Sequence, residues 1–307
     1  MNDDGSFPFA DLALARRLER AEALSNARFV EARARLVPSC GSCWIEVAGA
    51  HAMYDGPASP STQTFGLGMS QAPSADDLDR LEAFFVERGA PVFHEVSPLA
   101  DAVTITMLCE RDYQPFEFTS VLYRPIGEGA HGFPGAPDRG ARAGGPASPK
   151  QQRGEGGSAA VPRARLVGAG EAELFARTSA AGWREAGYSD FMLEFGRIHA
   201  DTEGLHLFLA ELEGQAIAAG AVSLHDGVAH LAGASTIPEG RRRGAQLALL
   251  DARLRHAAAH GCDVALMGAL PGSSSQRNAE RHGFRIAYTR VKWRLPGRDL
   301  PADLPHA

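Results

Sequence analysis

The sequence predicts a mixed α/β fold in which two similar halves follow one another along the chain. The 307 residues, 44% of them hydrophobic, are about enough for two hydrophobic cores. Residues 127–161 are rich in Gly, Pro, Ala, Arg and Ser, and so few of them are large and apolar that burial cannot offset their ordering entropy. Segments with helical and strand periodicity alternate on both sides. We therefore expect two domains, 1–126 and 162–307, joined by a flexible linker over 127–161.

The N-terminal half opens on helix and continues with strands. Apolar residues at helical spacing predict one or two helices within 11–36. Alternating or apolar runs predict strands at 43–47, 64–68, 92–96 and 118–124, and amphipathic segments predict helices at 76–88 and 100–111.

The C-terminal half has the same kinds of element in a clearer order. Helices are expected at 171–183, 190–199, 246–259 and 274–282, and strands at 205–211, 216–224, 229–237, 263–267 and 285–295. Strands in series followed by alternating strands and helices predict a mixed sheet with helices on both faces.

Short matches relate the two halves. Glu110-Arg111 and Glu280-Arg281 have the same offset as 118–124 and 288–294, and 86–92 matches 258–264 at an offset only slightly changed. Ordered matches at a near-constant offset favour a tandem repeat of one fold.

Composition excludes several classes of function. A formal net charge of −6 argues against a nucleic-acid binder, and no apolar run is long enough to span a membrane. Since the first residues lack a basic leader, we expect a cytoplasmic protein. The four cysteines are too few for a disulfide scaffold, and Cys40 and Cys43 have the spacing of only half a zinc site. We expect no metal.

The loop from Thr236 to Leu247 carries the strongest chemical signal. It joins an apolar strand to an amphipathic helix and contains three arginines and Gly244. A glycine there allows backbone amides to approach a phosphate, and the helix start adds unpaired N–H groups. The competing interpretation is a plain turn with a solvated basic cluster. Neither a Walker nor a Rossmann glycine pattern is present.

At this loop the sequence resembles the GNAT superfamily of acyl-CoA-dependent N-acyltransferases. The pyrophosphate motif of that family, Arg/Gln-x-x-Gly-x-Gly/Ala, is matched by Arg241 and Gly244 after Pro238-Glu239. A helix ending in Gly-Phe follows in the family, as 273–284 does here. The resemblance covers 164–295 and extends as a degenerate copy over the N-terminal half.

This resemblance implies two tandem GNAT-like domains, each a mixed, centrally splayed β-sheet with helices on both faces. It implies transfer of an acetyl group from acetyl-CoA to a primary amine by direct attack. The strand ending at Ile237 would splay from 263–267 and hold the cofactor. The implied cofactor-binding residues are Ser235, Thr236, Ile237, Arg241, Arg242, Arg243, Gly244, Ala245, Gln246 and Asn278.

Two positions depart from the family pattern. Gln246 stands where Gly or Ala is usual, and Ala279 replaces a tyrosine that protonates the leaving thiolate in many members. The segment 69–75, where the N-terminal half would need a phosphate loop, has no arginine, and Asp76 and Asp77 follow it. A phosphate there would meet like charge, so we expect no coenzyme A in that half.

Candidates for proton transfer are few. His230, early on the splayed strand, is the candidate base, although a strand histidine is more often structural. Tyr288, Ser274 and Ser275 are considered as acids. The alternative role is packing for Tyr288 and helix capping for Ser274 or Ser275. A non-catalytic acyl-CoA-binding or interaction protein remains the alternative function. The amine acceptor, a small molecule or a peptide, and the oligomeric state stay open.

Overall fold

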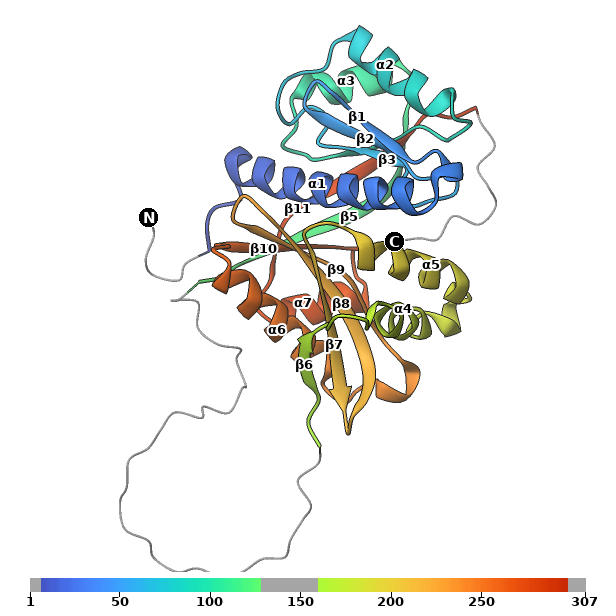
Figure 1. Cartoon of the computed structure of the whole chain (residues 1–307). Coiled ribbons are helices and arrows are strands. Elements are labelled where there is room, and N and C mark those ends of the chain that lie inside the picture. Colours follow the sequence, from blue (N-terminus) through green and yellow to red (C-terminus); the bar gives the residue numbers. More distant parts are fainter. Residues whose placement is uncertain (1–6, 128–159, 298–307) are drawn as a thin grey trace, which may run out of the picture.

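The computed structural model describes residues 7–127 and 160–297. Nearly all of the predicted linker, 128–159, lies outside these residues. The described strands form one mixed sheet in the order β1-β2-β3-β4-β11-β5-β10-β9-β8-β7-β6 (Figure 1). The mixed α/β class is therefore confirmed. The strands are β1 (Cys43–Val47), β2 (Ala50–Tyr54), β3 (Gln63–Phe65), β4 (Phe93–Val96), β5 (Gln114–Pro125), β6 (Arg163–Leu166), β7 (Leu205–Leu212), β8 (Gln215–His225), β9 (Val228–Thr236), β10 (Val264–Ala269) and β11 (Arg285–Arg294).

Seven α-helices and three 3-10 turns pack on this sheet within the described residues. They are α1 (Leu12–Leu36), η1 (Pro38–Cys40), α2 (Ala75–Val86), α3 (Ala102–Glu110), α4 (Ala172–Ala181), η2 (Arg184–Ala186), α5 (Ser189–Asp201), η3 (Pro238–Gly240), α6 (Ala245–Ala259) and α7 (Ser274–Arg281). Strands β2 and β6 were not predicted, since Ala50-His51-Ala52 and Arg163-Ala164-Arg165 hold no β-branched residue and no Phe, Tyr or Trp.

The halves exchange strands at the centre of the sheet. β5, from the N-terminal half, lies between β10 and β11 of the C-terminal half, and β11 lies between β4 and β5. Three ladders hold these strands, β4–β11, β11–β5 and β5–β10, and all three are antiparallel. Two separate sheets were expected. One continuous sheet results, because each half places its last strand beside the last strand of the other.

The sequence repeat corresponds to a local twofold axis through the β5–β11 ladder. Phe118 pairs with Val291, and Val121 pairs with Tyr288. The sequence match equates Phe118 with Tyr288 and Val121 with Val291, so exchanging the halves maps the ladder onto itself. The outer neighbours of the two strands are related in the same way. Val291 of β11 pairs with Val96 of β4, and Val121 of β5 pairs with Gly268 of β10. The two halves therefore repeat one strand arrangement.

Helix α1 crosses the boundary between the halves. It is a single helix of 25 residues whose N-terminus is capped by Asp11, which accepts a hydrogen bond from the Leu14 N–H. It packs on β1, β2 and β3 of its own half and on β8, β9 and α5 of the other (Figure 1). α4 and α5 share this face of the sheet, whereas α6 and α7 pack on the opposite face.

Beneath α1, a cluster of buried charges lies where the strands are exchanged. Arg290 on β11 contacts Glu22 at 2.6 Å and Glu95 at 2.8 Å, and both carboxylates are nearly inaccessible. Glu19 accepts a hydrogen bond from the Tyr288 hydroxyl at 2.8 Å. Burial raises the pKa of Glu19 to about 7, although Arg290 acts in the opposite direction. Glu19 is thus a carboxyl that the folded state holds protonated into the neutral range.

Glu19→Gln should therefore make stability less dependent on pH. The folded-state pKa of Glu19 is above the unfolded value near 4.5. The contribution of Glu19 to the free energy of unfolding is therefore fully present below pH 4.5 and is lost as pH rises through 7. The shift corresponds to at most about 3 kcal/mol. Melting temperatures of both proteins should be measured from pH 5 to pH 8. As pH rises, the stability of the variant should increase relative to that of the wild type. The exposed Glu87→Gln is the control, and a difference that stays constant with pH would contradict this assignment.

Candidate functional site

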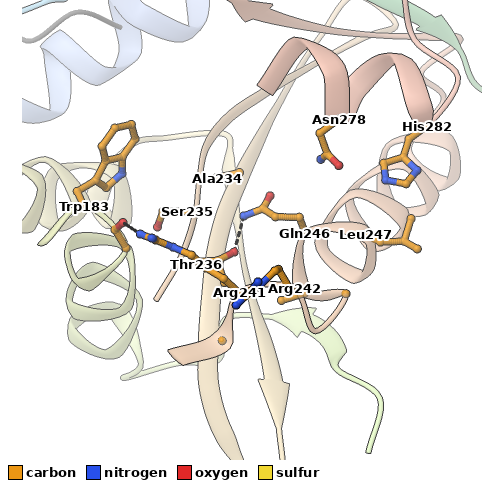
Figure 2. Close-up of a pocket in the computed structure, with 14 residues that line it drawn as sticks. Trp183, Ala234, Ser235, Thr236, Arg241, Arg242, Gln246, Leu247, Asn278 and His282 are labelled. Carbon is orange, nitrogen blue, oxygen red and sulfur yellow. Dashed lines mark hydrogen bonds between the residues drawn. The ribbon is translucent and has the colours of Figure 1, made fainter. Parts of the chain in front are cut away.

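A pocket of about 600 Å³ lies where β9 ends and α6 begins (Figure 2). One wall comes from the end of α4, another from the loop and first turn of α6, and a third from α7. The lining residues are Gly182, Trp183, Ala234, Ser235, Thr236, Gly240, Arg241, Arg242, Gly244, Ala245, Gln246, Leu247, Asn278 and His282.

The start of α6 offers this pocket unpaired backbone donors. Gly244 is the N-cap, with φ +85°, and no side chain caps the helix. The first helical hydrogen bond runs from the Ala248 N–H to the Gly244 carbonyl, so the three preceding N–H groups have no acceptor within the helix. A Cβ at Gly244 would meet nothing within 4 Å, and no acidic residue lies in the first turn. The helix start therefore suits an anion.

β9 opens an edge beside that helix start. Its pairing with β10 covers only Val228 to His230, opposite Val264 to Leu266. Between Ala232 and Ser235 the β9 strand has one residue more than β8 opposite it, a bulge at which Gly233 has φ +60°. Residues 231–236 thus have no ladder with β10, and the expected splay is present. Backbone groups along such an edge can bind an extended ligand.

Polar side chains complete the pocket. Gln246, one of the two departures from the family pattern, donates from Nε2 to the Thr236 hydroxyl at 2.7 Å and so ties the helix start to the end of β9 (Figure 2). Arg242 lines the pocket and has φ +60°. Arg241 pairs with Glu185 at 2.5 Å, in an exposed position where ion pairs contribute little.

Eight of the ten predicted cofactor residues line this pocket. Ile237 and Arg243 do not: the Ile237 side chain packs against the core while its N–H bonds the Ile217 carbonyl, and Arg243 is exposed. Sequence reasoning missed six lining residues: Gly182, Trp183, Ala234, Gly240, Leu247 and His282. The last of these lies in the helix motif 273–284 and could have been found there. No sequence pattern indicated that Gly182 and Trp183, at the end of α4, line the pocket, because tertiary packing brings them there.

The candidate acid and base residues lie elsewhere. His230 is buried on the α1 side of β9, where burial lowers its pKa despite the opposing charge of Glu22. Tyr288 donates to Glu19 within the buried charge cluster, and burial raises the Tyr288 pKa well above its usual value. Ser275 is exposed. None of the three lines the pocket.

One expectation about α7 is corrected, and the place of Ala279 is now clear. The capping residue is Ser273, whose hydroxyl accepts from the Gln276 N–H, rather than Ser274 or Ser275. Ala279 is 1% exposed and packs in the core, whereas Asn278 and His282 line the pocket. A tyrosine at 279 would have to displace core side chains.

The corresponding helix start in the N-terminal half is already capped. Ser74 and Asp77 form a reciprocal capping box at the start of α2, with the Ser74 N–H donating to Asp77 at 2.9 Å. Across the described residues, no group of three metal-ligating side chains occurs. No helix of the described segments is long and apolar enough to cross a bilayer.

The opened strand beside an uncapped helix start defines a site for an extended ligand with a phosphate group, of the kind found in acyl-CoA-dependent transferases. Residues 172–284 match the Acetyltransferase (GNAT) family, and this segment is a GNAT domain. For this segment, the match implies acyl transfer from an acyl-CoA. No curated protein matches the chain.

One solved structure extends the likeness in fold to both halves. A GCN5-related N-acetyltransferase from Kribbella flavida aligns with a TM-score of 0.52 at 17% identity, covering 88% of this chain and 95% of the other. Over the aligned part, this chain thus has the fold of that structure. A putative acetyltransferase of the GNAT family from Novosphingobium aromaticivorans aligns at 0.45, with 14% identity over 88% and 96% of the two chains. A tandem GNAT protein from the clavulanic acid biosynthesis pathway aligns at 0.49, with 11% identity over 81% and 79%.

Proposed function

We propose that this protein is an N-acetyltransferase that transfers an acetyl group from acetyl-CoA to a primary amine. The observation that carries the proposal is the pocket between the uncapped start of α6 and the opened edge of β9. One end offers backbone donors to an anion and the other offers a strand edge to an extended chain. Acetyl-CoA combines these two features in one molecule, with a pyrophosphate joined to a pantetheine arm.

The pyrophosphate binds at the first turn of α6, with Arg241 and Arg242 beside it. Both arginines line the pocket, and Arg241 leaves its partner Glu185 to reach the phosphate. The pantetheine arm lies along residues 231–236 and bonds the backbone groups that β10 leaves unpaired. The thioester then lies near the bulge at Gly233, where the strand backbone turns.

The reaction follows from this arrangement. The amine nitrogen attacks the thioester carbonyl carbon, the carbon–sulfur bond breaks, and coenzyme A leaves as a thiolate. One proton passes from the nitrogen to a base. We retain His230 as the candidate base, acting through water because its side chain lies outside the pocket. Its lowered pKa keeps the imidazole neutral at pH 7, the form that accepts a proton.

Two measurements on the full chain test the proposal. Calorimetry should show acetyl-CoA binding with a stoichiometry of one per chain, because α2 is capped by its own side chains. Release of coenzyme A thiol during incubation with a panel of primary amines should identify an acceptor. Absence of binding would remove the proposal. Binding without thiol release for any amine would support instead a non-catalytic acyl-CoA-binding protein.

A further inference from the structure

Arg253 is a buried cation in the middle of α6. Its side chain lies among apolar neighbours on the helix face that packs on the sheet, and the residue is 4% exposed. Within the described part of the chain, no carboxylate forms an ion pair with it. Burial lowers the pKa of Arg253 to about 10, so the guanidinium stays charged at neutral pH. A buried charge without a counter-ion is costly unless hydrogen bonds compensate it. The acceptors of these hydrogen bonds identify the backbone that Arg253 keeps in place.

Those hydrogen bonds go to both strands at the bulge. Nη1 donates to the Ala221 carbonyl of β8 at 3.1 Å and lies 3.5 Å from the Ala232 carbonyl of β9. Nε donates to the Leu249 carbonyl of its own helix at 3.2 Å. The register between β8 and β9 shifts by one residue between the pairs Ala219–Ser235 and Ala221–Ala232. The guanidinium therefore bonds the two strands at the point where the ladder is interrupted.

Glycine at position 220 admits this side chain. A Cβ on Gly220 would lie 3.2 Å from Arg253 Nη1 and 3.3 Å from Cζ, closer than most real contacts. On the opposite face, a Cβ on Gly233 would lie 3.4 Å from the His199 ring. The bulge is thus packed from both faces of the sheet, by an arginine on one and a histidine on the other.

We propose that Arg253 is a positioning residue that fixes the bulge of β9 and, through it, the backbone that orients the thioester. The inference rests on the proposed acetyltransferase function. Arg253 lies on the helix whose first turn binds the pyrophosphate, two turns further along, so one rigid element sets the distance between the phosphate site and the acyl end. An aliphatic residue could fill the same volume but could not bond the carbonyls on either side of the bulge.

The test compares Arg253→Met and Arg253→Lys with the control Arg255→Met, which removes an exposed arginine of the same helix that pairs with Asp251. Arg253→Met should lower kcat by about 10- to 100-fold, because a displacement of about 1 Å at the reacting group is that costly. Acetyl-CoA affinity should change by less than about threefold, since the phosphate site is untouched. Arg253→Lys should recover part of kcat, and Arg255→Met should match the wild type.

Amide hydrogen exchange separates this inference from the proposed function. Arg253→Met should speed exchange in 231–236 relative to the rest of the sheet, and Arg255→Met should not. If the wild type binds acetyl-CoA but acetylates no amine, the proposed function fails, while exchange still decides whether Arg253 holds the bulge. Unchanged exchange in 231–236, or faster exchange with unchanged kcat, would overturn the inference. Should Arg253→Met fail to fold, Gly220→Ala, which crowds the guanidinium by a few tenths of an ångström, tests the same bond with a smaller expected effect.

Discussion

Ser120→Pro is expected to abolish cooperative folding of both halves at once. Ser120 is 1% exposed on β5 and pairs with Ala269 of β10 on one side and Thr289 of β11 on the other. Proline removes a ladder donor and its ring clashes within a central strand, at a cost of about 3 kcal/mol or more. Because β5 joins the two halves, the damage is not confined to the N-terminal one. Circular dichroism and denaturant unfolding of the full chain measure it.

Arg163→Pro is the matched control. Arg163 is the first residue of β6, an edge strand of the same sheet, and it pairs only with Glu211. Proline is tolerated at such positions, so unfolding should shift by no more than about 1 kcal/mol. Two equal shifts would show that the position of β5 in the sheet is not what matters.

Separate fragments provide a second measurement of the strand exchange. Segment 160–307 contains the complete pocket but lacks β5, so β10 and β11 lose the strand between them. We expect neither 1–127 nor 160–307 alone to unfold cooperatively, and we expect the mixture to recover both cooperative unfolding and acetyl-CoA binding. A fragment 160–307 that folds and binds alone would contradict this. The division into domains at 1–126 and 162–307 is then a division of the sequence rather than of the sheet.

Gly244→Asp is expected to weaken acetyl-CoA binding by about two orders of magnitude while leaving the fold intact. A non-glycine residue at φ +85° costs roughly 1–2 kcal/mol, and a carboxylate at this helix start repels the pyrophosphate and competes for its N–H donors. About 1.4 kcal/mol corresponds to each tenfold loss of affinity. Since a Cβ at Gly244 meets nothing within 4 Å, the side chain itself causes no clash. Calorimetry with the purified variant measures the loss.

Two controls isolate the charge. Gly244→Ala keeps the backbone strain without the carboxylate, and its affinity should fall by about tenfold or less. Gly89→Asp places the same residue at another exposed glycine with positive φ, +65°, after α2 and with open space around it. It should lose a similar amount of stability and bind acetyl-CoA normally. If Gly244→Asp bound as well as Gly89→Asp, the start of α6 would not be the phosphate site.

The phosphate loop could be predicted because its geometry is local. The positive φ of Gly244 and the free N–H groups of the first turn of α6 depend on neighbouring residues, so a contiguous motif specifies them. The same holds for Thr236 and Gln246, ten residues apart and joined by one hydrogen bond. Residues outside the motif could not be found this way. Trp183 reaches the pocket only because α4 packs against the end of β9.

The mixed α/β class, the repeat of one arrangement in two halves, and the loop where α6 begins could all be predicted from the sequence. Periodicity and a short motif are patterns of neighbouring residues, and the repeat is found by comparing contiguous segments. Long-range packing is what exchanges β5 and β11, turns Ala279 to the core, and makes Tyr288 donate to Glu19 instead of lining the pocket. Each strand can form ladders with strands of its own half or of the other half. Its pattern of residues is compatible with either neighbour. Which strand becomes the neighbour depends on contacts between residues more than a hundred positions apart. These contacts contribute to stability only when the whole sheet forms.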